Sequence, residues 1–388
     1  MRLFQCAHQV VLHMRLQALL LTPDEKIERV LRRVLGDLEI SVEYCADTDS
    51  ALNKLTRDRF EAVIVDCDDD ETAARVLKSV RATMRNKRAV AVAIIDSQKR
   101  VRGAFELGAH FVLYKPISAE RAKTSFRAAR ALMKRERRRN TRIPIEIPVQ
   151  LTFAGGAGGV EAKTSDLGEG GIAISVSQRL ESGAALGIQF VLPDTDSRIE
   201  ARGEIAWVNA GRSAGLRFTE IAPQAQDKIK RWLDSQAPDL DSDDPPVSCR
   251  LTDLSVGGCY LELAAPFPLR TKVILSLGVA APDAKIEGTV LVAHPEVGMG
   301  VAFSRKTGEQ QKQVETFIQT LVGGSSVPDL FVEPEGLESG EEAIADPSLP
   351  ADPLTDLFRQ KSDLPLDEFQ RELQKQRGAP QPAAGAHA

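Results

Sequence analysis

A glycine-rich acidic turn occurs twice in this chain of 388 residues, and the repeat limits the folds that the chain can adopt. Segment 166–171 reads Asp-Leu-Gly-Glu-Gly-Gly, and segment 253–258, at an offset of 87, reads Asp-Leu-Ser-Val-Gly-Gly. Segment 215–218 reads Gly-Leu-Arg-Phe, and segment 300–303, at an offset of 85, reads Gly-Val-Ala-Phe. Two nearly equal offsets at opposite ends of one stretch indicate a duplicated structural unit.

Around the first copy, apolar residues alternate with others, which predicts half-buried β-strands. A helix at 224–235 follows them. Short strands closed by a helix are typical of a small antiparallel barrel. The second copy also ends in a helix, with Val314 and Phe317 on its apolar face, but its first strand is missing. The strands predicted for the first copy are 145–153, 160–165, 172–177, 186–192, 199–208 and 215–219.

The N-terminal third alternates short apolar runs with amphipathic stretches. This order predicts a doubly wound α/β domain, in which helices cover both faces of a parallel sheet. Sites in such sheets lie at the carboxyl ends of the strands. The predicted strands are 18–21, 40–44, 62–65, 89–95 and 111–114, and the predicted helices are 24–36, 50–57, 71–85, 99–107 and 119–136.

Residues 14–136 resemble a response-regulator receiver domain. Asp66 ends the third predicted strand, where a receiver carries its phosphoacceptor. Lys115-Pro116 follows the fifth strand, like the Lys-Pro pair of receivers. The resemblance implies that Asp66 is a candidate phosphoacceptor.

The receiver pattern is incomplete around Asp66. Thr22 and Pro23 stand where a receiver has the acidic pair that holds magnesium, and Asp96 stands where it has Thr or Ser. Phosphoryl transfer needs a divalent cation, and Asp96 would repel a phosphorylated Asp66. We therefore expect a degenerate receiver that acts in dimerisation or protein contact, with a phosphorylated switch as the alternative. The acidic run 68–70 is expected to be solvated surface, with a substitute metal site as the alternative.

An arginine-rich segment precedes the first acidic turn by about twenty-five residues. It contains Arg137, Arg138, Arg139 and Arg142. Guanidinium groups bind phosphate oxygens and stack on aromatic faces, and a carboxylate such as Asp166 accepts hydrogen bonds from a guanine. The pairing predicts a site for an anionic planar ligand.

This pairing resembles the PilZ domain, whose R-x-x-x-R and [D/N]-x-[S/A]-x-x-G motifs bind cyclic di-GMP in many members. Arg138 and Arg142 have the R-x-x-x-R spacing, and Gly168 stands where the family usually has Ser. The missing hydroxyl removes one hydrogen bond, worth about 0.5–1.5 kcal/mol. The resemblance implies that Arg138 and Arg142 contact phosphate and guanine. The implied ligand-binding set is Arg137, Arg138, Arg139, Arg142, Asp166, Gly168, Gly170 and Gly171.

The second copy has the hydroxyl of Ser255 but lacks an R-x-x-x-R ahead of it, and only Arg250 precedes the motif. Arginine–phosphate bonds contribute about 1.5–3 kcal/mol each, more than the neutral hydroxyl. We therefore expect the first copy to bind ligand and the second to be a packing or partner surface. The alternative for both motifs is a tight turn that needs glycine, beside ordinary surface arginines.

Eight basic residues and one acid lie between Arg127 and Arg142. There are two alternatives to ligand binding. The segment is a solvated helix end followed by a linker, or its positive charge attracts nucleic acid or a membrane surface. Aromatic residues are not interleaved here, so stacking on single strands is not expected. We expect this connector to become ordered when ligand arrives and to swing the receiver-like domain against the barrel.

Composition excludes several other classes. The net charge of −5 gives no global case for nucleic-acid binding. The five cysteines form no C-x-x-C pair, which favours a reducing compartment, hence the cytoplasm, and the scattered histidines do not suggest a metal. No run approaches the ~18 apolar residues of a membrane span. We expect no cofactor and no enzymatic activity, because no nucleophile–base pair or carboxylate dyad is evident.

The expected organisation is multidomain. The proline- and acid-rich tail is expected to be disordered, apart from a short helix at 367–376 and two candidate docking points, Leu330-Phe331 and Leu357-Phe358. Met14 is an alternative start. The predicted segments are a disordered leader (1–13), a receiver-like domain (14–136), a PilZ domain (137–236), a linker (237–246), a degenerate PilZ-like domain (247–323) and the tail (324–388).

The predicted function is that of an effector that binds cyclic di-GMP and transmits this state to a protein partner, with homo-oligomerisation as a further prospect. One alternative is a scaffold or response regulator that binds no nucleotide and is controlled through the receiver-like domain. Another is a DNA-binding regulator, although a helix-turn-helix is not evident.

Overall fold

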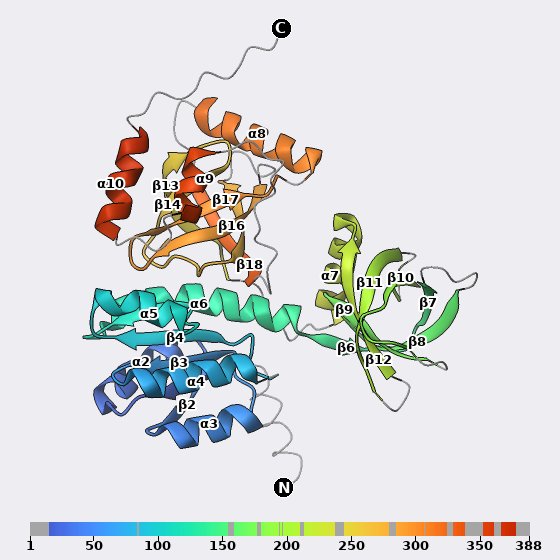
Figure 1. Cartoon of the computed structure of the whole chain (residues 1–388), viewed down its shortest axis with the longest axis horizontal. Coiled ribbons are helices and arrows are strands. Elements are labelled where there is room, and N and C mark those ends of the chain that lie inside the picture. The colour runs from blue at the N-terminus through green and yellow to red at the C-terminus, as the bar shows by residue number, and fades with distance from the viewer. Residues whose placement is uncertain are drawn as a thin grey trace. The chain divides into compact units, whose positions relative to one another are not determined.

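The chain forms two compact units, one made of Met1–Glu136 with Asp243–Ala388 and the other of Arg137–Ser242. Figure 1 shows their helices and strands. The expected leader at 1–13 lies outside the described residues. The computed structural model describes residues 15–83, 85–153, 159–176, 180–193, 195, 197–209, 213–236, 244–278, 285–305, 307–323, 329–337, 352–360 and 366–377.

A parallel sheet in the order β2-β1-β3-β4-β5 forms the N-terminal domain (Figure 1). This is the doubly wound order found in flavodoxin-like folds. β4 is apolar and buried throughout, as expected for a strand covered on both faces. The strands are β1 (Leu16–Leu21), β2 (Ile40–Cys45), β3 (Ala62–Asp66), β4 (Val90–Ile95) and β5 (Phe111–Tyr114).

Helices cover both faces of this sheet. α2 and α6 pack on one face, and α3, α4 and α5 pack on the other. Asp24 starts α2 by accepting hydrogen bonds from the amides of Lys26 and Ile27. The helices are α2 (Glu25–Asp37), α3 (Thr48–Arg57), α4 (Asp70–Ala82), the short 3-10 helix η1 (Gln98–Arg100), α5 (Val101–Glu106) and α6 (Ala119–Arg139). The predicted α/β architecture is confirmed.

The second unit is a β-barrel closed by a helix. Its strands follow the order β6-β8-β7-β10-β11-β12-β9, and an added β8–β9 pairing closes the ring. Alternate residues point inward: in β7, Val149 and Leu151 are buried and their neighbours are exposed. The elements are β6 (Arg142–Pro144), β7 (Pro148–Phe153), β8 (Val160–Gly168), β9 (Gly171–Ser175), β10 (Ala185–Val191), β11 (Arg198–Val208), β12 (Ser213–Ile221) and α7 (Pro223–Gln236).

The C-terminal part of the first unit is a second closed barrel, in the order β13-β14-β17-β16-β15-β18. Two barrels, each with a helix after its consecutive strands, confirm the predicted fold class. The elements are β13 (Val247–Leu254), β14 (Gly258–Glu262), β15 (Thr271–Leu277), β16 (Lys285–His294), β17 (Gly298–Phe303), α8 (Gly308–Gly323), β18 (Leu330–Leu337), α9 (Pro353–Gln360) and α10 (Leu366–Arg377).

β18 takes the place of the strand that the second copy lacks at its start. It pairs antiparallel with β13 and β15, as β7 pairs antiparallel with β8 and β10 in the first barrel. The two barrels therefore have equivalent strand neighbours, but the second draws one strand from beyond its closing helix. Its topology is a circular permutation of the first.

The expectation that 324–388 is disordered is wrong for the described part of the tail. Leu330 and Val332 of β18 point into the barrel and are buried. Leu357, Phe358 and Phe369 of α9 and α10 are also buried, which agrees with the candidate docking point at Leu357-Phe358 and the short helix. The tail is polar on average, but a few of its apolar residues are spaced so that they lie on one face of a strand or helix. Such a face can be buried against the rest of the protein.

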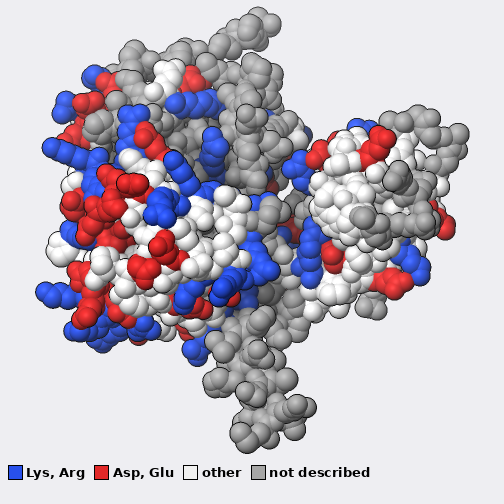
Figure 2. Space-filling view, turned by 60° about the horizontal axis from the view of Figure 1, so that its bottom comes forward, with Lys and Arg blue, Asp and Glu red and all other residues white. Residues whose placement is uncertain are grey.

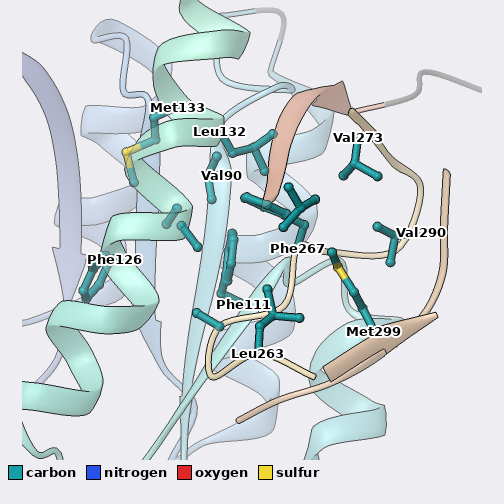
Figure 3. Packing of buried hydrophobic residues seen from close by; sticks show 14 of the residues in the cluster. Val90, Phe111, Phe126, Leu132, Met133, Leu263, Phe267, Val273, Val290 and Met299 are labelled. Carbon is teal, nitrogen blue, oxygen red and sulfur yellow. The ribbon is translucent and has the colours of Figure 1, made fainter. Parts of the chain in front are cut away.

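The receiver-like domain and the second barrel share one hydrophobic core. Figure 3 shows Phe111 of β5 and Leu132 of α6 close to Leu263 and Phe267, which both follow β14. Phe267 is 0% exposed, which is the environment of a domain interior. These two parts therefore form a single folded body.

Polar contacts join α6 to β18 and to the start of the second barrel. Arg135 Nε donates to the carbonyl of Glu335 at 3.0 Å, and the Leu337 amide donates to Glu136 Oε1 at 2.7 Å. Lys134 Nζ lies 2.9 Å from Asp244 Oδ1. Lys134, Arg135 and Glu136 are buried, and pairing is what allows charged groups to be buried.

The expected flexible connector is therefore helical. α6 continues through Arg139, three residues past the predicted end of the helix. Arginine is a good helix former, and cations near a helix C-terminus are stabilised by the helix dipole. The helix therefore includes Arg137–Arg139 of the basic segment.

Basic and acidic side chains are interspersed over the face drawn in Figure 2. Of the helices within the described ranges, none combines the length and the apolar character needed to cross a membrane.

Candidate ligand-binding site

Arg142 and Asp166 meet on adjacent strands of the first barrel. β6 pairs with β8 so that Pro144 lies opposite Asp166 and Arg142 lies opposite Gly168. Arg142 Nη1 donates to Asp166 Oδ1 at 2.6 Å. The two side chains are 46% and 28% exposed, so the pair is open to solvent and to a ligand.

Glycines allow neighbouring backbone segments to approach closely at the end of β8. A Cβ at Gly168 would lie 3.1 Å from the Thr141 carbonyl and 3.2 Å from Arg142 Cγ. A Cβ at Gly171 would lie 2.1 Å from the Leu216 carbonyl, which no side chain could accommodate without a backbone shift. Gly170, in the turn, has open space where a Cβ would be. Asp166 and Gly168 thus lie on β8, and only Gly170 of this set lies in the turn itself.

Arg137, Arg138 and Arg139 form the last turn of α6. The chain leaves this turn through Thr141, whose hydroxyl donates to the Arg137 carbonyl at 2.9 Å and whose amide donates to the Arg138 carbonyl at 2.9 Å. The three arginines are half-buried, and each has further interaction partners. Arg142 is thus the predicted arginine that the structure pairs with Asp166, while the other three precede it on the helix.

Trp207 belongs to the same row of residues as Asp166. Ala173 of β9 pairs with Asp166 on one side and with Gly215 of β12 on the other, and Gly215 pairs with Trp207 of β11. Residues opposite one another in a ladder point to the same face. Trp207 is 45% exposed, so its indole offers an aromatic face on the surface that carries Asp166.

Sequence reasoning did not include Trp207. Its place depends on the pairing of β11 with β12 and of β12 with β9, which hydrophobic alternation does not reveal. The one available indication was a tryptophan at the polar end of a long strand.

The second copy of the motif has different surroundings. Arg250, the arginine that precedes it on β13, pairs with Glu262 on β14, with 3.0 Å between Nε and Oε2. The Ser255 hydroxyl accepts a hydrogen bond within the turn from the Gly258 amide at 3.1 Å. The second motif is therefore a self-bonded turn whose nearest preceding arginine is held by another carboxylate.

Asp66 lies at the carboxyl edge of the parallel sheet, with its side chain 1% exposed. Lys115 Nζ, just after β5, lies 2.8 Å from Asp66 Oδ1. The hydroxyl of Thr22, just after β1, donates to Asp66 Oδ2 at 2.7 Å. The structure thus brings together three of the positions that the receiver resemblance singled out, with a neutral hydroxyl in place of an acid.

The other carboxylates near this edge also have partners, and Asp68 shares Lys115 with Asp66. Asp68 lies 2.6 Å from Lys115 Nζ, Asp69 caps α4, and Asp70 pairs with an arginine of η1. Within the described ranges, no group of three or more His, Cys, Asp and Glu residues is placed to hold a metal ion. The acidic run is used to cap a helix and to pair with basic side chains.

The fold and the repeated motif define a protein with a receiver-like domain and two small β-barrels that each carry the glycine-turn motif. The sequence model of the PilZ domain family matches residues 136–235 and 237–320. These two segments are PilZ domains, and they follow an N-terminal domain with a receiver-like fold.

A comparison with curated protein sequences finds no match. Similar solved structures include the PilZ domain of CeSA from a cellulose-synthesizing bacterium, at 25% identity over 25% of this chain and 98% of that chain, with a TM-score of 0.22. The receiver domain of a sensor histidine kinase from Pseudomonas aeruginosa PAO1, with magnesium in its active-site cleft, is 21% identical over 27% of this chain and 89% of that chain, with a TM-score of 0.26. A chemotaxis response regulator of Vibrio cholerae is 23% identical over 30% of this chain and 98% of that chain, with a TM-score of 0.28.

Proposed function

We propose that the first barrel binds cyclic di-GMP and that the chain is a non-enzymatic effector that passes this state to a protein partner. The observation that supports this most directly is the exposed Arg142–Asp166 pair beside the glycine turn. A dinucleotide offers phosphates to the guanidinium and a guanine edge to the carboxylate, so each member of the pair has a partner of matching charge or hydrogen bonding.

The remaining site residues have supporting roles in this proposal. Arg138 contacts phosphate or the face of a guanine, and Arg137 and Arg139 add positive charge. Gly168, Gly170 and Gly171 let the ligand approach the backbone. Trp207 stacks on a base, because its indole lies exposed in the row of Asp166.

Transmission follows from the continuity of α6 in this proposal. The helix ends in Arg137–Arg139, and its preceding turns carry Leu132 and Met133 in the core shared with the second barrel. Contacts of ligand with the last turn would bias the position of this helix. The body formed by the receiver-like domain and the second barrel is then the partner-facing part. Unpaired cysteines at 45, 67, 249 and 259 fit a reducing compartment such as the cytoplasm.

Calorimetric titration of the full chain with cyclic di-GMP tests the proposal. Arg138→Ala and Arg142→Ala should each weaken binding by about 2–4 kcal/mol, or about thirty- to a thousandfold. Arg250→Ala, at the arginine that precedes the second motif, is the matched control and should bind like the wild type. Unchanged affinity in both site variants would remove the site assignment.

A phosphorylation-controlled scaffold that binds no nucleotide is the second candidate. It is favoured by the buried Asp66 with Lys115 at 2.8 Å, and disfavoured by Thr22 in the acidic position. Incubation with acetyl phosphate and magnesium separates the two: label in the wild type that is absent from Asp66→Asn, without any heat of cyclic di-GMP binding, would support the scaffold. A DNA-binding regulator would instead show steeply salt-dependent binding to duplex DNA.

A further inference from the structure

The glycine turn of the second barrel is occupied by a carboxylate from the same chain. Asp352, just before α9, accepts a hydrogen bond from the Gly257 amide at 3.0 Å through Oδ2. Its Oδ1 accepts from the Ser255 hydroxyl at 2.9 Å. Asp352 is 8% exposed, so these donors replace the water that a carboxylate would otherwise bind.

The same carboxylate starts the helix that follows it. Asp352 Oδ1 also accepts from the Thr355 amide at 2.9 Å, and the Asp352 carbonyl accepts from the Asp356 amide at 2.9 Å. One side chain therefore satisfies donors of the barrel and of α9 together. An acidic residue at a helix N-cap is suited to both, because the helix dipole and free amides favour negative charge there.

Apolar side chains of α9 and α10 fill the surface next to this contact. Leu354, Leu357, Phe358, Phe369 and Leu373 form a cluster with Tyr260 and Val292 of the barrel, separate from the barrel core. The ring centroids of His294 and Phe369 lie 4.4 Å apart. A Cβ at Gly300 would come within 2.8 Å of the Phe358 ring, so the barrel surface is shaped to this side chain.

The barrel does not need this segment to close. Its ring of β13, β14, β17, β16, β15 and β18 is complete, and α9 contacts the outside of β14, β16 and β17. The equivalent turn in the first barrel differs. A Cβ at Gly170 would meet nothing within 4 Å, whereas a Cβ at Gly257 would lie 2.6 Å from Asp352 Cγ. The segment thus behaves like a bound ligand on a finished barrel.

We propose that the second barrel is a peptide-binding module for an amphipathic helical segment led by an acidic N-cap residue, and that Asp352, α9 and α10 of this chain are its ligand. The backbone amide of Gly257 and the hydroxyl of Ser255 bind the carboxylate, and Tyr260 and Val292 bind the apolar face. This assignment is independent of nucleotide binding by the first barrel.

Hydrogen exchange of the full chain tests the proposal from both sides. In the wild type the amides of 354–360, 367–377 and Gly257 should be protected. Asp352→Ala should make them exchange about ten- to a hundredfold faster, since it removes charge-assisted bonds, while the strands β13–β18 keep their protection. Gly257→Ala should give the same release, because the added methyl takes the place of the Asp352 carboxyl group. Asp367→Ala, an exposed acid on α10, and Gly170→Ala, at the open turn, are the matched controls and should leave the exchange of these amides unchanged.

Addition in trans distinguishes a ligand from a part of the fold. A synthetic peptide of residues 352–377 should restore protection of Gly257 in a full chain carrying both Asp352→Ala and Phe358→Ala. The same peptide with Asp352→Ala should not. The proposal is overturned if α9 and α10 exchange at unprotected rates in the wild type, if the strands lose protection together with α9 in both release variants, or if the native peptide restores nothing.

Discussion

The indole ring of Trp207 lies over Gly215 so closely that a Cβ at Gly215 would fall 2.1 Å from Nε1. The two residues face each other across β11 and β12, next to a register shift between Ile205 and Trp207. The missing side chain at Gly215 therefore creates the space in which the ring lies flat on the sheet. This contact fixes an aromatic face on the surface of the barrel that carries Asp166.

Gly215→Ala should destabilise the first barrel by about 1–3 kcal/mol, because the methyl group displaces the indole from its packed position. Urea unfolding followed by circular dichroism measures the change. Gly170→Ala, where a Cβ meets nothing within 4 Å, is the control and should unfold near the wild-type midpoint. Equal midpoints for both variants would show that the ring relocates without cost.

Trp207→Ala should weaken cyclic di-GMP binding by about 1–3 kcal/mol, roughly five- to 150-fold, if the indole stacks on a base as proposed. Trp207→Phe should retain most of the affinity because it keeps a flat aromatic face. Titration calorimetry provides the measurement, and Val208→Ala, the exposed neighbour, serves as the control. Wild-type affinity in Trp207→Ala would place the ligand elsewhere on the barrel.

Lys115→Ala should destabilise the first unit by about 3 kcal/mol, because it leaves the buried Asp66 carboxylate with Thr22 but without a cation. Asp66→Asn added to this variant should recover much of the loss, since a neutral amide needs no counter-charge. A double-mutant cycle of unfolding free energies tests the coupling. Additive effects would show that the two groups do not stabilise each other.

Acid should weaken the first unit through His294. Burial lowers the pKa of His294 to about 4 from the ordinary 6.5. Between these values the unfolded chain binds a proton that the folded chain excludes. Stability therefore falls as the pH drops from 6.5 to 4, by about 3 kcal/mol in full. Tyr260, whose hydroxyl lies 3.0 Å from Nδ1, stays neutral here, because the ordinary tyrosine pKa of 10 is far above this range and burial raises the pKa of Tyr260 further.

Urea unfolding between pH 7.5 and 4.5 should show a smaller pH dependence in His294→Gln than in the wild type. A residual dependence is expected from His110, whose pKa burial and the nearby Arg81 also lower. The pH dependence that remains in His294→Gln can therefore be compared with the part that His294 contributes in the wild type. Parallel pH profiles for wild type and His294→Gln would mean that His294 titrates normally in the folded chain.

Most of the architecture could be predicted from the periodicity of apolar residues in the sequence. The continuous apolar run of β4 and the alternation of β7 show a strand buried on both faces and a strand buried on one, and both readings are confirmed. The repeated glycine turn marked two barrels because close backbone approach, as at Gly171, leaves room for no other residue. These features are local in sequence.

Contacts between distant residues could not be predicted. β18 forms from a proline- and acid-rich stretch because it pairs with the free edges of β13 and β15. The local sequence preference of this stretch does not indicate a strand. Asp352 caps α9 and meets Gly257 only once the barrel is folded. In the candidate site, spacing brought attention to Arg142 and Asp166, whereas the strand register was needed to find Trp207.

The closing strand of the second barrel comes late in synthesis. While a nascent chain still ends before Leu330, β13 and β15 each present an open edge, although the first barrel has already left the ribosome complete. Open edges recruit other strands and so promote aggregation. A chain truncated before β18 would therefore have a complete first barrel and a second barrel with two unpaired strand edges. We expect such a chain to aggregate, and its exposed edges would allow cellular quality control to recognise it.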